Sequence, residues 1–186
     1  MQVIPTKLPE VLLIEPKVFG DGRGYFLEAW NQQRYAALGL VPFVQDNLSS
    51  SCRGTLRGLH YQNPQSQGKL VTVYLGEVYD VAVDIRRGSS TFGQWVGVLL
   101  SGGNGRQLYV PPGFAHGFCV LSDWADLHYK VSRRYDPADS GGLRWNDPDV
   151  GIRWPIEAPR LTARDAAYPL LRELAPAGLP HHPPAE

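Results

Sequence analysis

The chain consists of short apolar segments separated by glycine and proline, a pattern typical of strands joined by turns. The clearest segment runs from Val71 to Ile85, and in its second half Tyr79, Val81 and Val83 alternate with Asp80, Ala82 and Asp84. Alternation with a period of two places one set of side chains on each face of a strand. Further strands are predicted at residues 93–100, 107–110, 117–121 and 126–132. This spacing favours a mostly β sandwich or barrel of antiparallel strands.

Helical patterns are confined to two short segments. One covers Gln32 to Leu38 and ends at Gly39, and the other lies around Ala163 to Leu174. A chain of 186 residues suits one domain with its own hydrophobic core. Past Ala175 the sequence is rich in proline and has few residues to bury, and His181 and His182 in it are not expected to bind a metal specifically. We therefore expect one domain over residues 1–175 and a flexible tail over residues 176–186.

The charge pattern narrows the class of partner. Lys and Arg number 18, Asp and Glu also number 18, and neither sign forms a long run. Nothing therefore predicts a nucleic-acid footprint or binding to an anionic membrane, and a small molecule is the favoured partner. No apolar run is long enough to cross a bilayer, the N-terminus lacks the pattern of a signal peptide, and Cys52 and Cys119 lie far apart. We expect a cytoplasmic protein.

The segment from Leu56 to Gln62, followed by Gln67 to Leu70, places Arg57, His60 and Lys69 close together in sequence. An imidazole titrates near neutral pH, so it can take a proton from a substrate. Fixed positive charge beside it would stabilise the anion that results. The alternative is a buried structural histidine flanked by two surface charges. These residues alone leave both readings open.

Two further segments carry candidate chemistry. In residues 109–118 a Pro-Pro-Gly turn leads to His116 at the start of a strand. In residues 128–135, Tyr129 and Tyr135 share one face of a continuous strand, whereas His128 points to the other face. A tyrosine can donate its phenolic proton to a carbanion, although most tyrosines on strands serve in packing.

Several segments together resemble the dTDP-4-dehydrorhamnose 3,5-epimerase family. They occur in the family's order and are Phe19–Phe26, Phe43–Asn47, Leu56–Gln62, Gln67–Val71, Phe114–Phe118 and Arg144–Pro148. The resemblance implies a cupin-like β jelly roll, a homodimer that shares edge strands, and no metal or organic cofactor. It also implies that the chain converts dTDP-4-dehydro-6-deoxy-D-glucose to dTDP-4-dehydro-L-rhamnose, on the route to dTDP-L-rhamnose for cell-surface polysaccharide.

The same resemblance assigns roles to residues. His60 is similar to the family's general base, Asp165 to its orienting carboxylate, and Tyr129 to its general acid, while Lys69 resembles the residue that stabilises the enolate. The resemblance also implies contacts to the substrate from Phe19, Arg23, Glu28, Gln45, Asp46, Asn47, Arg57, Lys69, His116, Tyr135, Ser140 and Arg164. Cupin-like barrels often hold metals, but His60 has no second histidine at an alternating strand position, which argues against a metal site.

Three positions depart from the family pattern. Ser140 stands where a Glu is common, Arg164 where a Lys is common, and Leu48 where a His is common. None of the three is a proton-transfer residue, so they bear on sugar selectivity and on the second epimerisation. The alternatives are therefore a single-site 3- or 5-epimerase of the same sugar and a nucleotide-sugar-binding jelly roll without catalytic activity. A 3,4-ketoisomerase of similar fold is disfavoured by the segments above.

Overall fold

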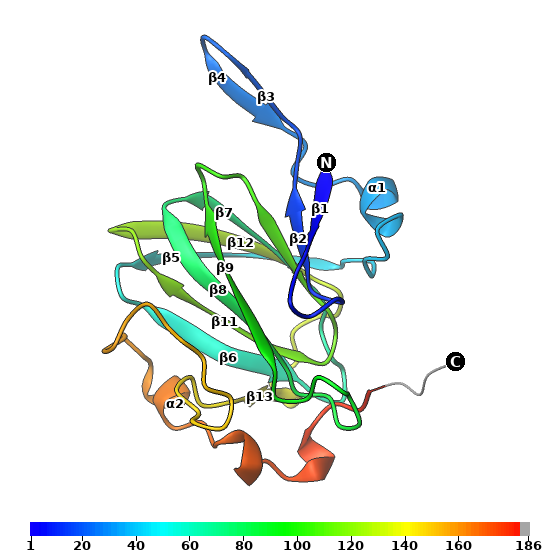
Figure 1. Ribbon diagram of the computed structural model, residues 1–186, viewed down its shortest axis with the longest axis vertical. Helices are drawn as coiled ribbons and strands as arrows, with labels where there is room; N and C mark the ends of the chain where they lie inside the picture. Colours follow the sequence, from blue (N-terminus) through cyan, green and yellow to red (C-terminus); the bar gives the residue numbers. More distant parts are fainter. Residues whose placement is uncertain (183–186) are drawn as a thin grey trace.

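Two antiparallel sheets face each other in the structure, a computed structural model in which residues 1–182 are described (Figure 1). The six-stranded sheet has the order β1 (Gln2–Pro5), β2 (Leu12–Glu15), β10 (Gln107–Val110), β7 (Lys69–Leu75), β12 (Trp124–Val131), β5 (Gln45–Cys52). The five-stranded sheet has the order β13 (Ser140–Gly142), β6 (Leu56–Gln62), β11 (Phe114–Val120), β8 (Glu77–Asp84), β9 (Trp95–Ser101). The two sheets do not close into a barrel. The predicted mostly β, cupin-like jelly roll is confirmed.

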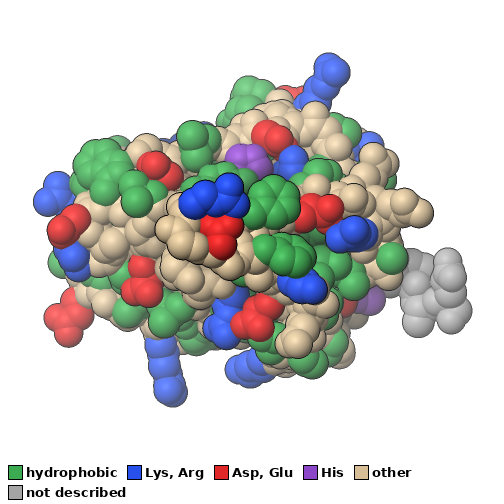
Figure 2. Space-filling model, turned by 90° about the horizontal axis from the view of Figure 1, so that it is seen from above, with side chains coloured by type: hydrophobic (Ala, Val, Ile, Leu, Met, Phe, Trp, Pro, Cys, Tyr) green, Lys and Arg blue, Asp and Glu red, His purple; other side chains and the backbone are tan. Residues whose placement is uncertain are grey.

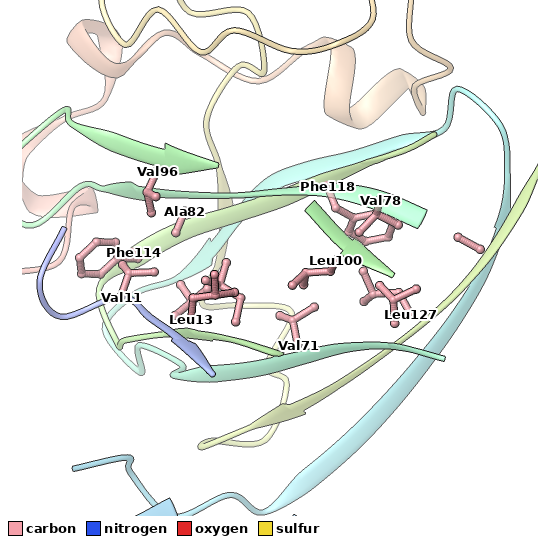
Figure 3. Close-up of a cluster of buried hydrophobic side chains, with 14 of the residues drawn as sticks. Val11, Leu13, Val71, Val78, Ala82, Val96, Leu100, Phe114, Phe118 and Leu127 are labelled. Atoms are coloured by element: carbon pink, nitrogen blue, oxygen red, sulfur yellow. The ribbon is translucent and has the colours of Figure 1, made fainter. Parts of the chain in front are cut away.

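The main hydrophobic core fills the space between the two sheets. Figure 3 shows Val71 and Leu127 of one sheet pointing toward Phe118 and Leu100 of the other. These side chains are at most 4% exposed. Because alternate residues of each strand point inward, the same register that builds this core also aims other residues at the space between the sheets.

The strand expected across residues 71–85 is two strands. Gly76 lies between β7 and β8 with φ 75°, a left-handed backbone conformation that glycine adopts readily. An alanine Cβ there would lie 2.0 Å from the Trp124 carbonyl oxygen. The chain therefore turns at Gly76, and β7 and β8 go to different sheets.

A two-stranded hairpin, β3 (Val18–Asp21) and β4 (Gly24–Leu27), projects away from both sheets (Figure 1). Phe19, Tyr25 and Phe26 on it are between 53% and 69% exposed. Figure 2 views the molecule from the end that carries the hairpin, where hydrophobic side chains lie exposed among charged ones. A hairpin that buries so little apolar surface in its own chain has few contacts to fix it.

Helices are short, as the sequence predicts. The first, α1 (Gln32–Ala36), is capped by Asn31, whose side chain accepts a hydrogen bond from the Arg34 N–H. The helix expected around residues 163–174 is instead α2 (Ala163–Ala166) followed by the 3₁₀ turn η1 (Leu171–Glu173). Pro169 lies between them, and a proline has no N–H to continue a helix.

The residues after Ala175 pack against the body of the domain as far as they are described. A second 3₁₀ turn, η2 (Pro176–Gly178), precedes Leu179, which is 7% exposed and belongs to a core cluster. Arg87 N–H donates to the Pro180 carbonyl at 2.8 Å, and the His182 N–H donates to the Arg87 carbonyl at 2.9 Å. Residues 176–182 of the expected tail are thus held in place, and residues 183–186 lie outside the described residues.

None of the helices in residues 1–182 is long and apolar enough to span a membrane.

Candidate active site

A cavity of about 370 Å³ opens between the two sheets at one end of the sandwich. Its walls are mainly polar and aromatic, and they come from both sheets and from the segment that contains α2. The lining residues are Gln45, Asn47, His60, Tyr61, Gln62, Gln67, Lys69, Tyr129, Tyr135, Ser140, Arg164 and Tyr168. Residues from β5, β6, β7 and β12, far apart in sequence, therefore meet at one site.

His60, on β6, is held by a buried carboxylate. Its Nε2 lies 2.8 Å from Asp165 Oδ1, and Asp165 is only 4% exposed. Helix α2 positions this carboxylate, since Thr162 caps the helix by accepting a hydrogen bond from the Asp165 N–H. Burial alone would raise the pKa of Asp165, but the hydrogen bond and the nearby His60 lower it below its ordinary value. An ionised Asp165 favours the tautomer in which Nε2 carries the proton, which leaves Nδ1 able to accept one.

Lys69 is the first residue of β7 and is 7% exposed. Burial lowers the pKa of its ammonium group to about 8, while Asp80 acts to raise it. Its Nζ lies 3.5 Å from the His60 carbonyl oxygen. The site therefore holds a positive charge beside the histidine at neutral pH, in a place shielded from water.

A second histidine–aspartate pair, His116 and Asp80, lies next to the first on the neighbouring strands of the same sheet. His116 on β11 is the register partner of His60, and its Nε2 lies 2.8 Å from Asp80 Oδ1. Asp80 is fully buried and His116 is 6% exposed. Burial lowers the pKa of His116, although Asp80 acts in the opposite direction. His116 is not among the cavity-lining residues but lies beside one of them, His60, on the neighbouring strand.

Tyr129 reaches the cavity from the opposite sheet. It lies on β12 and is paired with Asn47 of β5 and Val71 of β7. Burial raises the pKa of its phenol, and the nearby Arg57 acts to lower it. Tyr129 therefore keeps its proton at neutral pH and can donate it. Tyr135 also lines the cavity, but β12 ends at Val131, so it comes from the following loop and not from a continuous strand.

Alternation along β5 separates three neighbouring candidates. Gln45 and Asn47 face the cavity, and the Gln45 amide donates to Asn47 Oδ1 at 2.9 Å. Asp46 points to the outer face of the sheet, where Lys130 Nζ lies 2.9 Å from it. His128 lies on that outer face as well, as expected from its position beside Tyr129. Asp46, for which the family resemblance implies a contact to the substrate, therefore does not line this cavity.

Two of the three departures from the family pattern contact each other. Arg164 Nη2 donates to Ser140 Oγ at 2.8 Å, and both residues line the cavity. Within residues 1–182, Arg164 forms no ion pair with a carboxylate. The groups that raise the pKa of Arg164 are the phenols of Tyr135 and Tyr168, so no carboxylate in the described residues neutralises its charge. The third departure, Leu48, is 67% exposed and lies on β5 opposite His128.

Four other predicted contacts lie outside the lining of this cavity. Arg57 donates from Nε and Nη2 to Ser51 Oγ at 3.1 and 3.0 Å, next to Tyr129. Phe19 and Arg23 lie on the projecting hairpin, where Arg23 pairs with Asp21 at 2.6 Å. Glu28 follows the hairpin and pairs with Arg34 at 3.2 Å.

The cavity is also lined by residues that were not predicted from the sequence. Tyr61, Gln62 and Gln67 belong to the segments around His60 and Lys69, so the sequence contained a signal for them. Tyr168 could not be predicted in this way, because it lies in none of the segments that resemble the family. It reaches the cavity only through the fold of the segment after α2.

A larger cavity of about 750 Å³ lies elsewhere and offers no comparable chemistry. Prolines form much of its wall, together with Glu10 and Arg86. Arg86 is engaged by Asp84 at 2.8 Å and by Glu10 at 2.7 Å, so its guanidinium is already paired. Within residues 1–182, no three or more His, Cys, Asp or Glu side chains are arranged to hold a metal ion.

Comparison with known proteins gives a consistent picture. The family model for dTDP-4-dehydrorhamnose 3,5-epimerase matches residues 5–173. The enzyme of that name from Salmonella typhimurium is 55% identical over 175 residues, which cover 92% of this chain and 96% of that protein. A dTDP-4-dehydrorhamnose 3-epimerase from Streptomyces niveus is 42% identical and covers 96% of this chain and 88% of its own length.

This chain is similar throughout to a solved structure from Legionella pneumophila. That structure is of a dTDP-6-deoxy-D-glucose-3,5-epimerase in complex with dTDP-4-keto-L-rhamnose. Its TM-score is 0.96 at 51% identity, and the match covers 98% of this chain and 99% of that one.

Proposed function

The chain belongs to the dTDP-4-dehydrorhamnose 3,5-epimerase family, and from that premise we propose that it converts dTDP-4-dehydro-6-deoxy-D-glucose to dTDP-4-dehydro-L-rhamnose. The observation that carries the proposal is the placement of a histidine–aspartate pair and a protonated tyrosine on opposite walls of one cavity. An epimerase needs a base on one face of the sugar and an acid on the other. The product would supply dTDP-L-rhamnose synthesis, and we place the reaction in the cytoplasm.

The reaction requires no electron sink beyond the substrate's own ketone. The C4 carbonyl acidifies the hydrogens on C3 and C5, so His60 Nδ1 can take either proton and leave an enolate. The enolate carbon then takes a proton from Tyr129 on the other face, which inverts that centre, and solvent restores both residues. Asp165 would stabilise the imidazolium that forms between the two steps.

Stabilisation of the enolate falls to Lys69. Its ammonium is buried, so its charge acts on the developing oxyanion with little screening by water. Asp80, which holds His116, supports the charge because it raises the pKa of Lys69 toward its ordinary value. We assign His116 to the support of this oxyanion site.

Polar and aromatic residues around the rim would hold the nucleotide and the sugar. Gln45, Asn47, Ser140 and Tyr135 line the cavity and offer hydrogen-bonding groups or a ring face. Arg164 lines the cavity and Arg57 lies near Tyr129, and both would meet the diphosphate, since a guanidinium matches the geometry of phosphate oxygens.

We further propose that the enzyme works as a homodimer whose hairpins complete the sites. Phe19, Arg23 and Glu28 do not line the cavity of their own chain. The hairpin exposes Phe19, Tyr25 and Phe26, a cost that docking onto a second copy would remove. Docked there, Arg23 would bring a positive charge to the bound nucleotide of the other subunit.

A single-site epimerase of the same keto sugar is the second candidate. The Streptomyces niveus relative supports it, because that protein is named as a 3-epimerase. The Ser140–Arg164 contact supports it too, since a change at the cavity rim can shift how the sugar ring sits between base and acid.

Proton NMR of dTDP-4-keto-6-deoxyglucose with the enzyme in deuterated water separates these possibilities. Loss of both the H3 and H5 signals with formation of the L-rhamno product is the expected result. Loss of only one signal would assign a single-site epimerase. Retention of both signals with bound nucleotide sugar would identify a binding protein without catalytic activity.

A further inference from the structure

Tyr168 packs against the proposed base from the side of the segment that follows α2. Its ring centroid lies 5.8 Å from that of His60, with the two planes at 75°, an edge-to-face contact. The side chain is 9% exposed and forms part of the cavity wall. Asp165 lies only three residues earlier, so one short segment supports His60 twice, through a carboxylate and through a ring.

The backbone around Tyr168 is anchored. Arg144 Nε donates to the Tyr168 carbonyl at 2.9 Å, and the Arg144 N–H donates to the Pro169 carbonyl at 2.9 Å. Arg164 lies over the ring, with its guanidinium carbon 5.7 Å from the centroid. The ring is therefore held by contacts with both Arg164 and His60.

Gly142 makes the space that the ring fills. It lies on β13 and is the register partner of His60 on β6. A Cβ at Gly142 would lie 2.2 Å from Tyr168 Cζ, and its three nearest atoms would all belong to that ring. No left-handed φ is required at Gly142, so its backbone would accept alanine. The constraint on residue 142 is thus the Tyr168 ring itself.

The hydroxyl of Tyr168 is buried and has essentially no accessible surface, so a substrate in the cavity would not reach it without rearrangement. Burial raises the pKa of this phenol, and the nearby Arg164 guanidinium acts to lower it. The contacts with His60 and with the position of Gly142 are made by the ring, so the ring carries the effect of this side chain on His60.

We propose that Tyr168 is a positioning residue whose ring holds the His60 imidazole in the orientation that keeps Nε2 on Asp165 and Nδ1 toward the substrate. The inference rests on the proposed function, in which His60 is the base. Removal of the ring leaves a space beside His60 into which the imidazole can tilt or water can enter. Small misplacements of a reacting group cost rate more than they cost binding.

The test measures kcat, KM and the pH dependence of kcat for the enzyme and five variants. Tyr168→Ala is expected to lower kcat by about tenfold or more, with KM changed less than about threefold and the acid limb of the pH profile shifted. Tyr168→Phe, the conservative variant, retains the ring and is expected to keep kcat within about twofold. Gly142→Ala, which displaces the ring, should lower kcat as Tyr168→Ala does.

The double variant Gly142→Ala/Tyr168→Ala tests the inference most stringently. In it the alanine at residue 142 no longer clashes with a Tyr168 ring. The kcat of the double variant is expected to equal that of Tyr168→Ala alone. Gly97→Ala is the matched control, since its Cβ would lie 2.2 Å from the Tyr79 hydroxyl, on strands away from the cavity. It should lower the melting temperature and leave kcat and its pH profile unchanged.

Several results would overturn the inference. A large loss of kcat in Tyr168→Phe would assign the role to the hydroxyl, and a wild-type kcat in Tyr168→Ala would remove the role altogether. A parallel measurement on His60→Ala keeps this test separate from the proposed function. If His60→Ala still catalyses exchange at C3 or C5, the assignment of the base has failed; if it does not and Tyr168→Ala is normal, only the positioning role has failed.

Discussion

His60 and Tyr129 line the same cavity from opposite sheets, His60 from β6 of the five-stranded sheet and Tyr129 from β12 of the six-stranded one. A sugar ring between the two sheets would therefore present one face to the imidazole and the other to the phenol. Proton removal on one side and proton delivery on the other is the geometry that inverts a carbon. The jelly roll supplies this arrangement through its two-layer architecture.

The Asp165 carboxylate fixes the tautomer of His60, so its loss is expected to impair catalysis. Asp165→Asn should lower kcat by about 10²-fold or more, with a smaller effect on KM, because the amide can hold the ring with the wrong nitrogen protonated. Steady-state kinetics measure the effect. Asp149→Asn is the control, since Asp149 pairs with Arg172 at 3.4 Å on the surface. Equal activity of Asp165→Asn and the wild type would contradict the role.

Lys69 is expected to give the alkaline limb of the pH profile. Its pKa is lowered to about 8, so the ammonium is charged below that pH and neutral above it. Activity that depends on the charge must then fall as pH rises through about 8. Lys69→Met should lower kcat by about 10²-fold or more and abolish this limb, whereas Lys69→Arg, which stays charged, should move the limb to higher pH. A limb unchanged in Lys69→Arg would assign it to another group.

A substitution of Asp80 provides a second test of the Lys69 titration. Its negative charge raises the pKa of Lys69, so Asp80→Asn should move the alkaline limb to lower pH. The pH dependence of kcat measures the shift. A limb that stays in place or moves to higher pH in this variant would mean that the Asp80 carboxylate does not raise the pKa of Lys69.

The sequence predicted those parts of the fold in which apolar alternation is strong. Strand β10 has the predicted bounds, and the strand expected at residues 126–132 is β12. Strand β5 was not predicted, because both its faces carry polar residues: Gln45 and Asn47 face the cavity, and Asp46 faces outward. A strand that lines a polar site lacks the alternation of apolar and polar residues by which strands are predicted.

Site residues could be predicted where they belong to extended motifs. His60, Lys69 and Tyr129 were assigned through motifs, and the structure places all three around one cavity. Asp46 is adjacent to two cavity residues in sequence, yet strand alternation turns it away. Tyr168 could not be found, because its position depends on the packing of a loop against β13 and not on a local pattern.

The hairpin should act on the partner's site, which a mixing experiment can show. Arg23→Ala and His60→Ala are each expected to be nearly inactive as homodimers at limiting substrate. Coexpressed, they form heterodimers in which one site combines an intact His60 with the intact hairpin of the other subunit. Activity should then recover to about a quarter of the wild-type value if the subunits pair at random.

The control for that experiment mixes His60→Ala with Asp165→Asn. Both changes affect the pair within one subunit, so no heterodimer contains an intact site and no activity should return. Absence of recovery in the first mixture, with heterodimers demonstrated by mass, would place the hairpin's action within its own chain.

Asp84 is expected to dominate acid stability. It is fully buried and binds Arg86, Ser89 and Thr91. Burial acts to raise its pKa, but these hydrogen bonds lower it to about 2 from 3.8. Because the folded-state pKa is the lower one, the stabilisation is complete above pH 3.8 and is lost as pH falls through about 2.

Asp84→Ala should therefore reduce the free energy of unfolding at neutral pH by about 3–5 kcal/mol, because it leaves a buried guanidinium without its buried partner. Urea unfolding measures the change. Asp123→Asn, which removes an exposed partner of Arg53, should cost less than about 1 kcal/mol. A loss in Asp84→Ala no larger than in that control would refute the structural role.

The most direct test of the two-wall mechanism follows deuterium and configuration together in His60→Ala and Tyr129→Phe. The keto sugar is incubated with each variant in deuterated water, and NMR reports exchange and inversion at C3 and C5. We predict no exchange with His60→Ala, and exchange with retained configuration with Tyr129→Phe, because His60 can then return deuterium only to the face it deprotonated. Inversion at the wild-type rate in Tyr129→Phe, or exchange in His60→Ala, would contradict the mechanism.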